Sequence, residues 1–215
     1  MSRLLLVRHG RTKLHRADRF WGSTDIALSD IGMRQAEQLR HRLAKEKISA
    51  VYTSTLSRAR STTDIITSRR KTKITTCKEL NECNFGYIEG LTFDEIQRLH
   101  PELAEELLSW KTVSFPGGES LEDLDNRVRS FFDRLDKHKE KETVLIVAHG
   151  GPLRLIICNL LGLGLEHWLQ LRVEHASLSI VETYPQGPIL TLLNDTSHLK
   201  PRREHAPGFR FMERR

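Results

Sequence analysis

The sequence predicts an α/β fold: a mostly parallel sheet with helices on both faces, in three layers. Two short apolar segments, residues 3–7 and 143–148, have the character of buried strands, and each is followed closely by a His-Gly pair. Amphipathic helices lie between them, one capped by Ser29 and running to about Lys45, and another capped by Ser120. Alternation of strands and helices is typical of a doubly wound parallel core.

The remaining elements follow the same alternation. Residues 50–53 predict a further strand, which leads into a helix starting near Ser57, and residues 155–161 predict a helix after a proline. Residues 177–183 and 189–193 predict two late strands, one of them antiparallel at an edge of the sheet.

The 215 residues suffice for one sizeable domain, which we place at residues 1–197. The irregular stretch at about 71–118 interrupts the alternation, and we expect this insertion to form a cap over the active end of the sheet. Residues 198–215 form a basic tail, whose six Lys/Arg and two Glu supply +4 of the formal net charge of +6. The tail could bind nucleic acid or acidic lipid, but its prolines and lack of periodicity favour a solvated segment.

Cysteine usage and hydropathy narrow the class of protein. Cys77, Cys83 and Cys158 show no paired C-x-x-C spacing, so neither a zinc site nor a disulfide framework is indicated, and a reducing, cytoplasmic setting is expected. The apolar run at residues 4–7 is too short for a signal segment, and the run at 152–165 is interrupted by polar residues. We expect a soluble protein without a membrane partner; a homodimer is compatible with the sequence.

Histidines and arginines mark the candidate site. His9 and His149 follow predicted strands, Arg8 precedes His9, and Arg58 lies in a strand-to-helix turn. In a parallel sheet, ligands bind beyond the carboxyl ends of the strands, so these side chains would converge there if the two strands are neighbours. Paired guanidinium groups match phosphate oxygens and repel a metal ion. A neutral imidazole such as that of His9 could then attack phosphorus.

Each of these residues also has an ordinary alternative. A histidine after a strand can simply cap a turn, and an arginine near a helix start can be a surface charge. The repetition of strand-His-Gly, together with the arginines, favours a functional site.

The motifs resemble those of the histidine phosphatase superfamily, which includes the cofactor-dependent phosphoglycerate mutases. The resemblance covers most of the chain: residues 5–12 resemble the opening signature, 52–59 the second arginine motif and 146–151 the closing histidine motif. It implies a phosphoglycerate mutase-like fold in which His9 is the phosphorylated nucleophile. It also implies that Arg8, Arg58 and His149 hold the transferred phosphoryl group.

An acidic residue is needed to protonate the leaving alcohol. Residues 80–90 resemble the acid motif of the family's phosphatase branch, and 115–120 its G-G-E-S element; Glu82 matches the proton donor. The residues alone do not choose among Glu79, Glu82 and Glu89, and a surface charge is the alternative for Glu82. We expect Glu89, before Gly90, to brace the turn ahead of a helix capped by Thr92.

Residues 20–32 also follow the family pattern, in which groups after the first motif contact the substrate. Ser23 and Gly150 are therefore substrate-binding candidates. Where many relatives carry Glu or Gln and then Asn, this chain has Arg11 and His15. His15 could still donate a hydrogen bond to the phosphate, or could be a loop residue.

Together these observations predict a metal-independent phosphomonoesterase without a cofactor, acting on a small phosphorylated metabolite of the α-ribazole phosphate or sugar phosphate type. The alternatives are a cofactor-dependent phosphoglycerate mutase and a non-catalytic phosphate-binding scaffold on the same fold. The short segment 87–92 resembles that of phosphatases and favours hydrolysis. Four aromatic side chains could either stack on the substrate or pack in the core: Trp21, Phe85, Tyr87 and Trp110.

Overall fold

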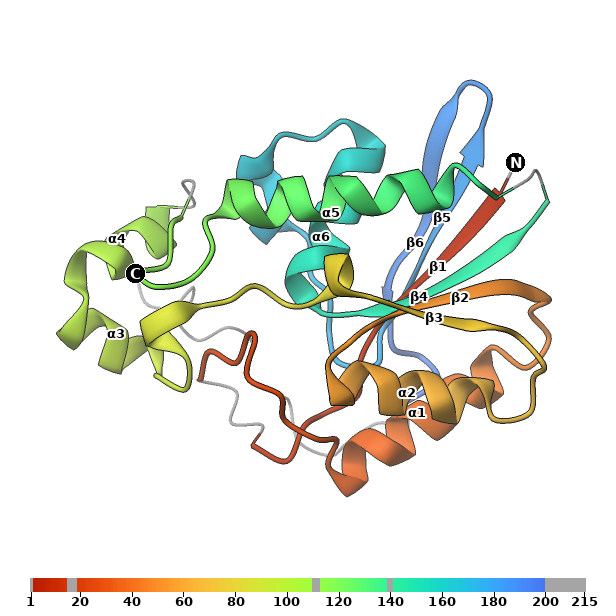
Figure 1. Cartoon of the computed structure of the whole chain (residues 1–215), viewed down its shortest axis with the longest axis horizontal. Coiled ribbons are helices and arrows are strands. Elements are labelled where there is room, and N and C mark those ends of the chain that lie inside the picture. The colour runs from red at the N-terminus through yellow and green to blue at the C-terminus, as the bar shows by residue number, and fades with distance from the viewer. Residues whose placement is uncertain (1, 15–18, 110–112, 139–140, 200–215) are drawn as a thin grey trace.

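A computed structural model describes residues 2–14, 19–109, 113–138 and 141–199 of the chain. Within these residues six strands form one sheet, in the order β3-β2-β4-β1-β5-β6 (Figure 1). The strands are β1 (Ser2–Arg8), β2 (Ile48–Ser54), β3 (Ile74–Cys77), β4 (Thr143–Ala148), β5 (Leu178–Tyr184) and β6 (Gly187–Asp195).

The directions of the strands decide which residues meet at the carboxyl ends of the parallel strands. β3, β2, β4 and β1 are parallel, β5 is antiparallel to β1, and β6 is antiparallel to β5. The reversed strand, β5, therefore lies one position in from the edge. β1 and β4 pair in a register that aligns Arg8 with Ala148, so His9 and His149 leave the sheet at the same level.

Helices cover both faces of the sheet, which gives the three predicted layers (Figure 1). α1 (Asp30–Arg42) and α2 (Ser57–Thr67) lie on one face, and α5 (Leu121–Leu135) and α6 (Gly150–Leu161) on the other. Successive side chains of a strand point to opposite faces. Leu4 and Leu6 accordingly join the α5–α6 core, whereas Leu5 and Val7 join the α1–α2 core.

The predicted helix starts are observed. Ser29 caps α1, and Ser120 caps α5 in a reciprocal capping box with Asp123. α6 begins earlier than predicted, at Gly150, with the extended His149 as its N-cap residue. A proline is tolerated in the first turn of a helix, where its missing N–H is not needed, so Pro152 does not delay the start of α6.

The expected insertion at about 71–118 does not leave the sheet at once. Its first residues form β3, whose β-branched residues pair with β2, and the chain leaves the sheet only after Cys77. Beyond the strand ends it forms two short 3-10 turns and the helices α3 (Phe93–Leu99) and α4 (Pro101–Ser109) (Figure 1). Thr92 caps α3 as predicted, while α4 was not foreseen. Of the basic tail, residues 200–215 lie outside the described residues.

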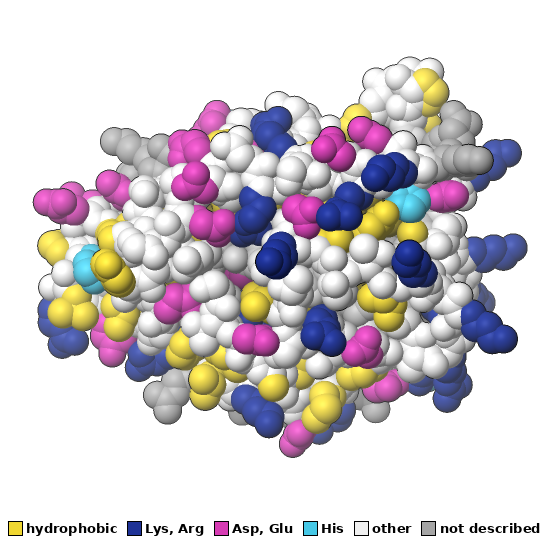
Figure 2. All heavy atoms as spheres, viewed as in Figure 1, with side chains coloured by type: hydrophobic (Ala, Val, Ile, Leu, Met, Phe, Trp, Pro, Cys, Tyr) yellow, Lys and Arg dark blue, Asp and Glu magenta, His cyan; other side chains and the backbone are white. Residues whose placement is uncertain are grey.

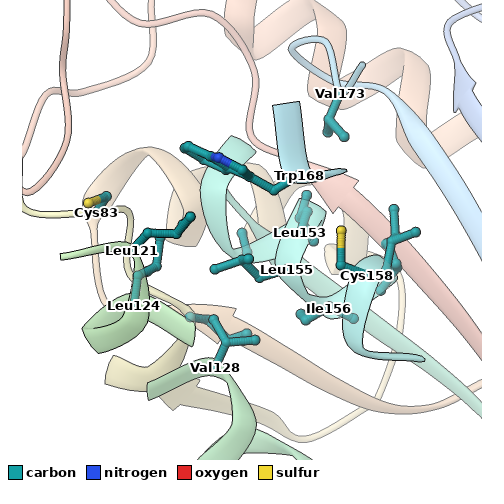
Figure 3. Close-up of a cluster of buried hydrophobic side chains, with 14 of the residues drawn as sticks. Cys83, Leu121, Leu124, Val128, Leu153, Leu155, Ile156, Cys158, Trp168 and Val173 are labelled. Carbon is teal, nitrogen blue, oxygen red and sulfur yellow. The ribbon is translucent and has the colours of Figure 1, made fainter. Parts of the chain in front are cut away.

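A core of buried apolar side chains includes residues of both α5 and α6. Figure 3 shows Leu124 and Val128 of α5 near Leu155 and Ile156 of α6, with Trp168 alongside. Trp168 belongs to η3 (Leu165–Gln170), the turn that follows α6. Three buried free thiols also belong to the structure: Cys77, Cys83 and Cys158.

The surface carries charges of both signs. On the face seen in Figure 2, basic and acidic side chains are interspersed across the described part of the molecule. None of the described helices has the length and apolar character needed to cross a membrane.

Candidate active site

Two histidines lie side by side at the carboxyl ends of the central strands. The ring centroids of His9 and His149 are 4.9 Å apart, and both side chains are buried. This proximity follows from the parallel pairing of β1 with β4. The sequence-based expectation that the two His-Gly pairs would meet is therefore confirmed.

His9 is held through one ring nitrogen. Its Nδ1 lies 2.7 Å from the carbonyl oxygen of Gly10, which can only accept a hydrogen bond. The proton of a neutral imidazole must therefore sit on Nδ1, and Nε2 carries the lone pair. This tautomer is the one that can attack an electrophile through Nε2.

His149 is held through both ring nitrogens. Arg58 Nε donates to His149 Nδ1 at 3.2 Å, and His149 Nε2 lies 2.8 Å from Ser54 Oγ. Because the Ser54 hydroxyl donates to Asn81 Oδ1, Ser54 Oγ accepts the proton of His149 Nε2. Burial, and then the nearby charge of Arg58, hold the pKa of His149 well below its usual value. His149 is therefore neutral at physiological pH.

Arg58, in the first turn of α2, is fixed by a loop that precedes α1. Its Nη1 donates to Thr24 O at 2.7 Å and its Nη2 to Gly22 O at 2.5 Å. Burial lowers the pKa of Arg58, and the charge of Glu82 opposes that shift. These two hydrogen bonds, together with the one from Nε to His149, fix the orientation of the guanidinium group.

The Glu89 carboxylate binds the same loop, at residues 22–24. Its carboxylate accepts the backbone N–H groups of Gly22, Ser23 and Thr24 at 2.7–3.2 Å, and the Thr24 hydroxyl at 2.5 Å. Burial raises the pKa of Glu89, but the hydrogen bonds from Thr24 and Ser23 outweigh it and leave the pKa below its usual value. The main partner of Glu89 is therefore the loop at residues 22–24, whose carbonyl groups orient Arg58, rather than the turn ahead of α3.

Arg8 interacts electrostatically with two other arginines, Arg58 and Arg154. Its Nη1 donates to Val173 O at 2.7 Å, while its buried Nε has no hydrogen-bond partner among the described residues. Burial lowers the pKa of Arg8 to about 10; Glu82 opposes the shift, and Arg154 and Arg58 add to it. A desolvated guanidinium with an unused donor is well suited to bind an anion.

Glu82 faces these arginines from the insertion. Its side chain is buried, and its Oε1 accepts from Cys83 N at 3.0 Å and from Gly151 N at 3.1 Å. A Cβ at Gly151 would lie 2.5 Å from Oε1, so a side chain at this position would displace the Glu82 carboxyl group. Oε2 accepts a longer bond from the same Gly151 N, at 3.4 Å, and is therefore the carboxyl oxygen better placed to carry a proton.

The structure distinguishes the three candidate glutamates. Glu79 forms an ion pair with Arg134 at 2.7 Å, and Glu89 is engaged by the loop at residues 22–24. Glu82 is the one bonded to the start of α6, beside the histidines. This placement agrees with the motif-based choice of Glu82.

Arg127 of α5 was not identified from the sequence, although it organises the segment that carries Glu82. Its Nε and Nη2 bind the two carboxylate oxygens of Glu119 at 2.8 and 2.9 Å. Glu119 in turn accepts from Asn84 N at 2.9 Å. The Arg127 guanidinium also donates to four consecutive or near-consecutive carbonyl oxygens, those of Lys78, Glu79, Asn81 and Glu82. Arg127 therefore clamps the backbone on which Glu82 is carried.

Two further residues near the site were also missed. The ring of His175 lies 5.2 Å from that of His9, and Arg154 of α6 is buried beside Glu82 and Arg8. His175 precedes β5, and the start of an antiparallel strand lies at the carboxyl end of its parallel neighbours. That topological rule is the signal that could have found it.

The three candidate substrate-binding residues differ in where they lie relative to the site. Ser23 is exposed, and its hydroxyl donates to Asn84 and Glu89, whereas His15 lies outside the described residues. A Cβ on Gly150 would lie 3.4 Å from Arg154 Nη1 and 3.6 Å from Arg8 Cζ, so Gly150 borders the arginine cluster. The described residues contain no group of three or more His, Cys, Asp or Glu side chains suited to a metal ion.

The sequence and the fold of the chain are similar to those of known proteins. The chain is 30% identical over 203 residues to phosphoserine phosphatase 1 of Hydrogenobacter thermophilus, covering 93% of this chain and 95% of that protein. It is 38% identical over 158 residues to phosphoglycerate mutase-like protein 4 of Arabidopsis thaliana, covering 71% and 68%. The crystal structure of α-ribazole phosphatase from Shigella flexneri superposes with a TM-score of 0.82 at 28% identity, covering 90% of this chain and 96% of that one.

The fold is thus the phosphoglycerate mutase-like α/β fold that the sequence predicted. The family model of the histidine phosphatase superfamily (branch 1) matches residues 4–196, and the chain belongs to this superfamily. The prediction of a phosphatase-type enzyme is confirmed with it.

Proposed function

We propose that the protein is a metal-independent phosphomonoesterase that transfers the phosphoryl group first to His9 Nε2 and then to water. The observation that carries this proposal is the 2.7 Å contact between His9 Nδ1 and Gly10 O, which places the proton on Nδ1 and the lone pair on Nε2. Arg8, Arg58 and His149 surround the same space, with Glu82 facing the arginines.

In the first step, Nε2 of His9 attacks phosphorus and the P–O bond to the alcohol breaks. Glu82 transfers its proton from Oε2 to the leaving oxygen, which departs as the neutral alcohol. The guanidinium groups of Arg8 and Arg58 neutralise the charge on the transferred group, and removing one such donor typically costs about 10²- to 10³-fold in rate.

In the second step, water attacks the phosphohistidine. The Glu82 carboxylate accepts a proton from the water, the N–P bond breaks, and inorganic phosphate leaves. Both His9 and Glu82 then return to their starting protonation states, so the cycle is balanced.

The positively charged side chains of the site support a mechanism without a metal ion. Arg8 and Arg58 interact electrostatically, so fixed positive charges cluster around the proposed position of the phosphoryl group. Such a cluster repels a divalent cation and itself supplies the charge stabilisation that magnesium provides in other phosphoryl-transfer enzymes.

For the substrate we propose a small phosphomonoester. Relatives and structural neighbours are named for phosphoserine and α-ribazole phosphate, which are both small metabolites. The similarity to a phosphoglycerate mutase-like protein keeps a mutase as the second candidate. A mutase would return the phosphoryl group to a second hydroxyl of a bound phosphoglycerate, whereas a phosphatase releases phosphate.

Trapping of the intermediate tests the mechanism. Wild-type protein mixed with labelled phosphomonoester and quenched in alkali should carry label that is stable to base and labile to acid. His9→Ala should carry none, and His41→Ala, a control on exposed α1 surface, should match the wild type. Turnover should be unchanged by a metal chelator.

Two results would contradict the proposal: label retained in His9→Ala, or turnover abolished by the chelator. Release of inorganic phosphate from 3-phosphoglycerate, measured against formation of 2-phosphoglycerate with and without the bisphosphorylated primer, separates the phosphatase from the mutase.

A further inference from the structure

Arg154 is a buried arginine beside the site to which the mechanism above assigns no role. It lies one turn into α6, with 9% of its surface exposed. Its Nε donates to Leu171 O at 2.7 Å, and its Cζ stands 5.9 Å from the centroid of the Trp168 ring. These contacts hold the guanidinium at its base and along one face, which fixes the direction of its Nη groups.

The Nη side of Arg154 points toward the site. A Cβ on Gly150 would meet Arg154 Nη1 at 3.4 Å, Arg8 Cζ at 3.6 Å and Glu82 Oε2 at 3.7 Å. Arg154 Nη1 and Glu82 Oε2 therefore border the same small space above the first residue of α6. Maintaining a charged guanidinium there is costly, because burial lowers the pKa of Arg154.

The order of the arginines shows which part of a substrate Arg154 would face. Arg58 Nε donates to His149 Nδ1 at 3.2 Å, whereas Arg154 Nη1 and Glu82 Oε2 border the same space above Gly150. Arg58 therefore stands on the side of His149, and Arg154 on the side of Glu82. Because Glu82 protonates the leaving oxygen in the proposed mechanism, Arg154 faces the alcohol portion of the ester.

We propose that Arg154 binds a carboxylate on the alcohol portion, which makes the enzyme selective for phosphomonoesters with a carboxylate close to the ester oxygen. This inference rests on the proposed function, because it uses Glu82 as the acid. A guanidinium edge with two N–H groups matches the two oxygens of a carboxylate. O-phosphoserine, the compound for which a relative is named, has this composition.

A carboxylate fits this position better than a second phosphate. Arg154 already uses Nε for Leu171, so it offers a single guanidinium edge, and one such cation balances one negative charge. Glu82 must be protonated to act as the acid, so a substrate carboxylate would meet no opposing charge from it in the first step. A dianionic phosphate would need a second cation, but Arg8 and Arg58 are committed to the transferred group.

A matched pair of substrates tests the selectivity. O-phosphoserine and O-phosphoethanolamine share the ester, the carbon next to it and the amine, and they differ by the carboxylate. The wild type should hydrolyse O-phosphoserine with a kcat/KM roughly 10- to 100-fold higher, the range of one charge-assisted hydrogen-bonded pair. A bisphosphorylated ester assayed in parallel should show no such advantage.

Arg154→Met should remove this preference by raising KM for O-phosphoserine while leaving kinetics with O-phosphoethanolamine close to wild type. Arg154→Lys, which keeps the charge and is the milder change, should retain part of the preference. Arg129→Met, an exposed arginine of α5 whose side chain is 59% exposed, is the control and should retain all of it.

The outcomes separate this inference from the proposed function. If the wild type hydrolyses p-nitrophenyl phosphate but shows no preference for O-phosphoserine, the carboxylate site is refuted and the phosphatase stands. If Arg154→Met or Arg154→Lys loses activity equally on both esters, Arg154 serves the phosphoryl group and the inference is wrong. If no phosphomonoester is hydrolysed by the wild type, the proposed function itself fails.

Discussion

The two sides of the site are built differently. The histidine side stands on the ends of paired strands, where β1 and β4 place His9 and His149 through the register of a buried sheet. The acid side is a loop from the insertion, and Glu82 is held there by hydrogen bonds from Arg127 and from the start of α6. Many residue pairs contribute to the register of β1 and β4, whereas the clamp on the Glu82 segment is the single side chain of Arg127. The acid side should therefore be separable from the histidine side by single substitutions.

The clearest separation comes from the leaving group. A phosphomonoester with a poor leaving group, such as an alkyl alcohol, needs a proton from the acid, whereas p-nitrophenolate is a weak base and leaves without one. Substitutions on the histidine side should harm both kinds of ester equally. Substitutions on the acid side should harm alkyl esters selectively.

The largest effect is expected for His9→Ala. Without the nucleophile, turnover should fall by about 10⁴-fold or more, because residues that act as a unit in catalysis lose most of their effect together. The loss should be the same for an alkyl phosphate and for p-nitrophenyl phosphate, measured as kcat/KM. A loss confined to the alkyl ester would show that His9 serves the leaving group instead.

The next effect is expected for Glu82→Gln. General acid catalysis contributes about 10²- to 10⁴-fold, so kcat on an alkyl phosphate should fall within this range. On p-nitrophenyl phosphate the fall should be about tenfold or less, limited to the step in which water attacks. Equal losses on both esters would contradict the role of Glu82 as proton donor.

A smaller effect of the same kind is expected for Arg127→Ala, which removes the clamp but keeps Glu82. The alkyl ester should lose roughly 10- to 100-fold, as is typical when supporting contacts of a functional residue are removed. Activity on p-nitrophenyl phosphate should be nearly unchanged. Added guanidinium ion should restore part of the activity on the alkyl ester.

The control for this prediction is Arg129→Ala, on the same helix, whose partner Asp125 lies one turn away on α5. It should leave both esters at wild-type rates. If Arg127→Ala instead lowers both esters by the same factor, Arg127 supports the fold as a whole and the two sides are not separable.

The smallest effect concerns pH and stability on the histidine side. Burial and Arg58 hold the pKa of His149 well below its usual value of 6.5, so below that pH the unfolded chain binds a proton that the folded protein does not. The free energy of unfolding should therefore fall as the pH drops below 6.5, with His149 contributing up to about 1.4 kcal/mol per pH unit.

Urea unfolding at pH 5 to 7 measures this slope. His149→Gln cannot titrate, so its unfolding free energy should depend less steeply on pH than that of the wild type. The same slope in both proteins would show that His149 binds a proton in the folded state and is not held neutral.

Glu89 links the two sides. Its position in the sequence, before a glycine and a capped helix, suggested a local turn, yet its carboxylate binds the backbone of a loop more than sixty residues earlier. That loop carries the carbonyl groups that orient Arg58. The insertion thus supports the histidine side as well as the acid, a contact that no local spacing indicates.

The sequence by itself determined the parts of the protein that depend on local patterns. Apolar runs ending in His-Gly identified β1 and β4, and capping residues identified α1, α3 and α5, because strand alternation and helix capping involve neighbours in the chain. Neighbouring parallel strands have their carboxyl ends on the same side of a sheet, and the sequence therefore predicts that His9, His149 and Arg58 lie close together.

Only the tertiary structure decided which long side chains reach the site from other elements. Arg127 on α5, Arg154 on α6 and His175 before β5 have no distinguishing spacing, since an arginine on a helix is most often a surface charge. Their roles follow from which helix packs beside which loop and from the reversed direction of β5. Those choices are set by the burial of apolar surface across the whole sheet, which is a property of the packed chain and not of any single segment.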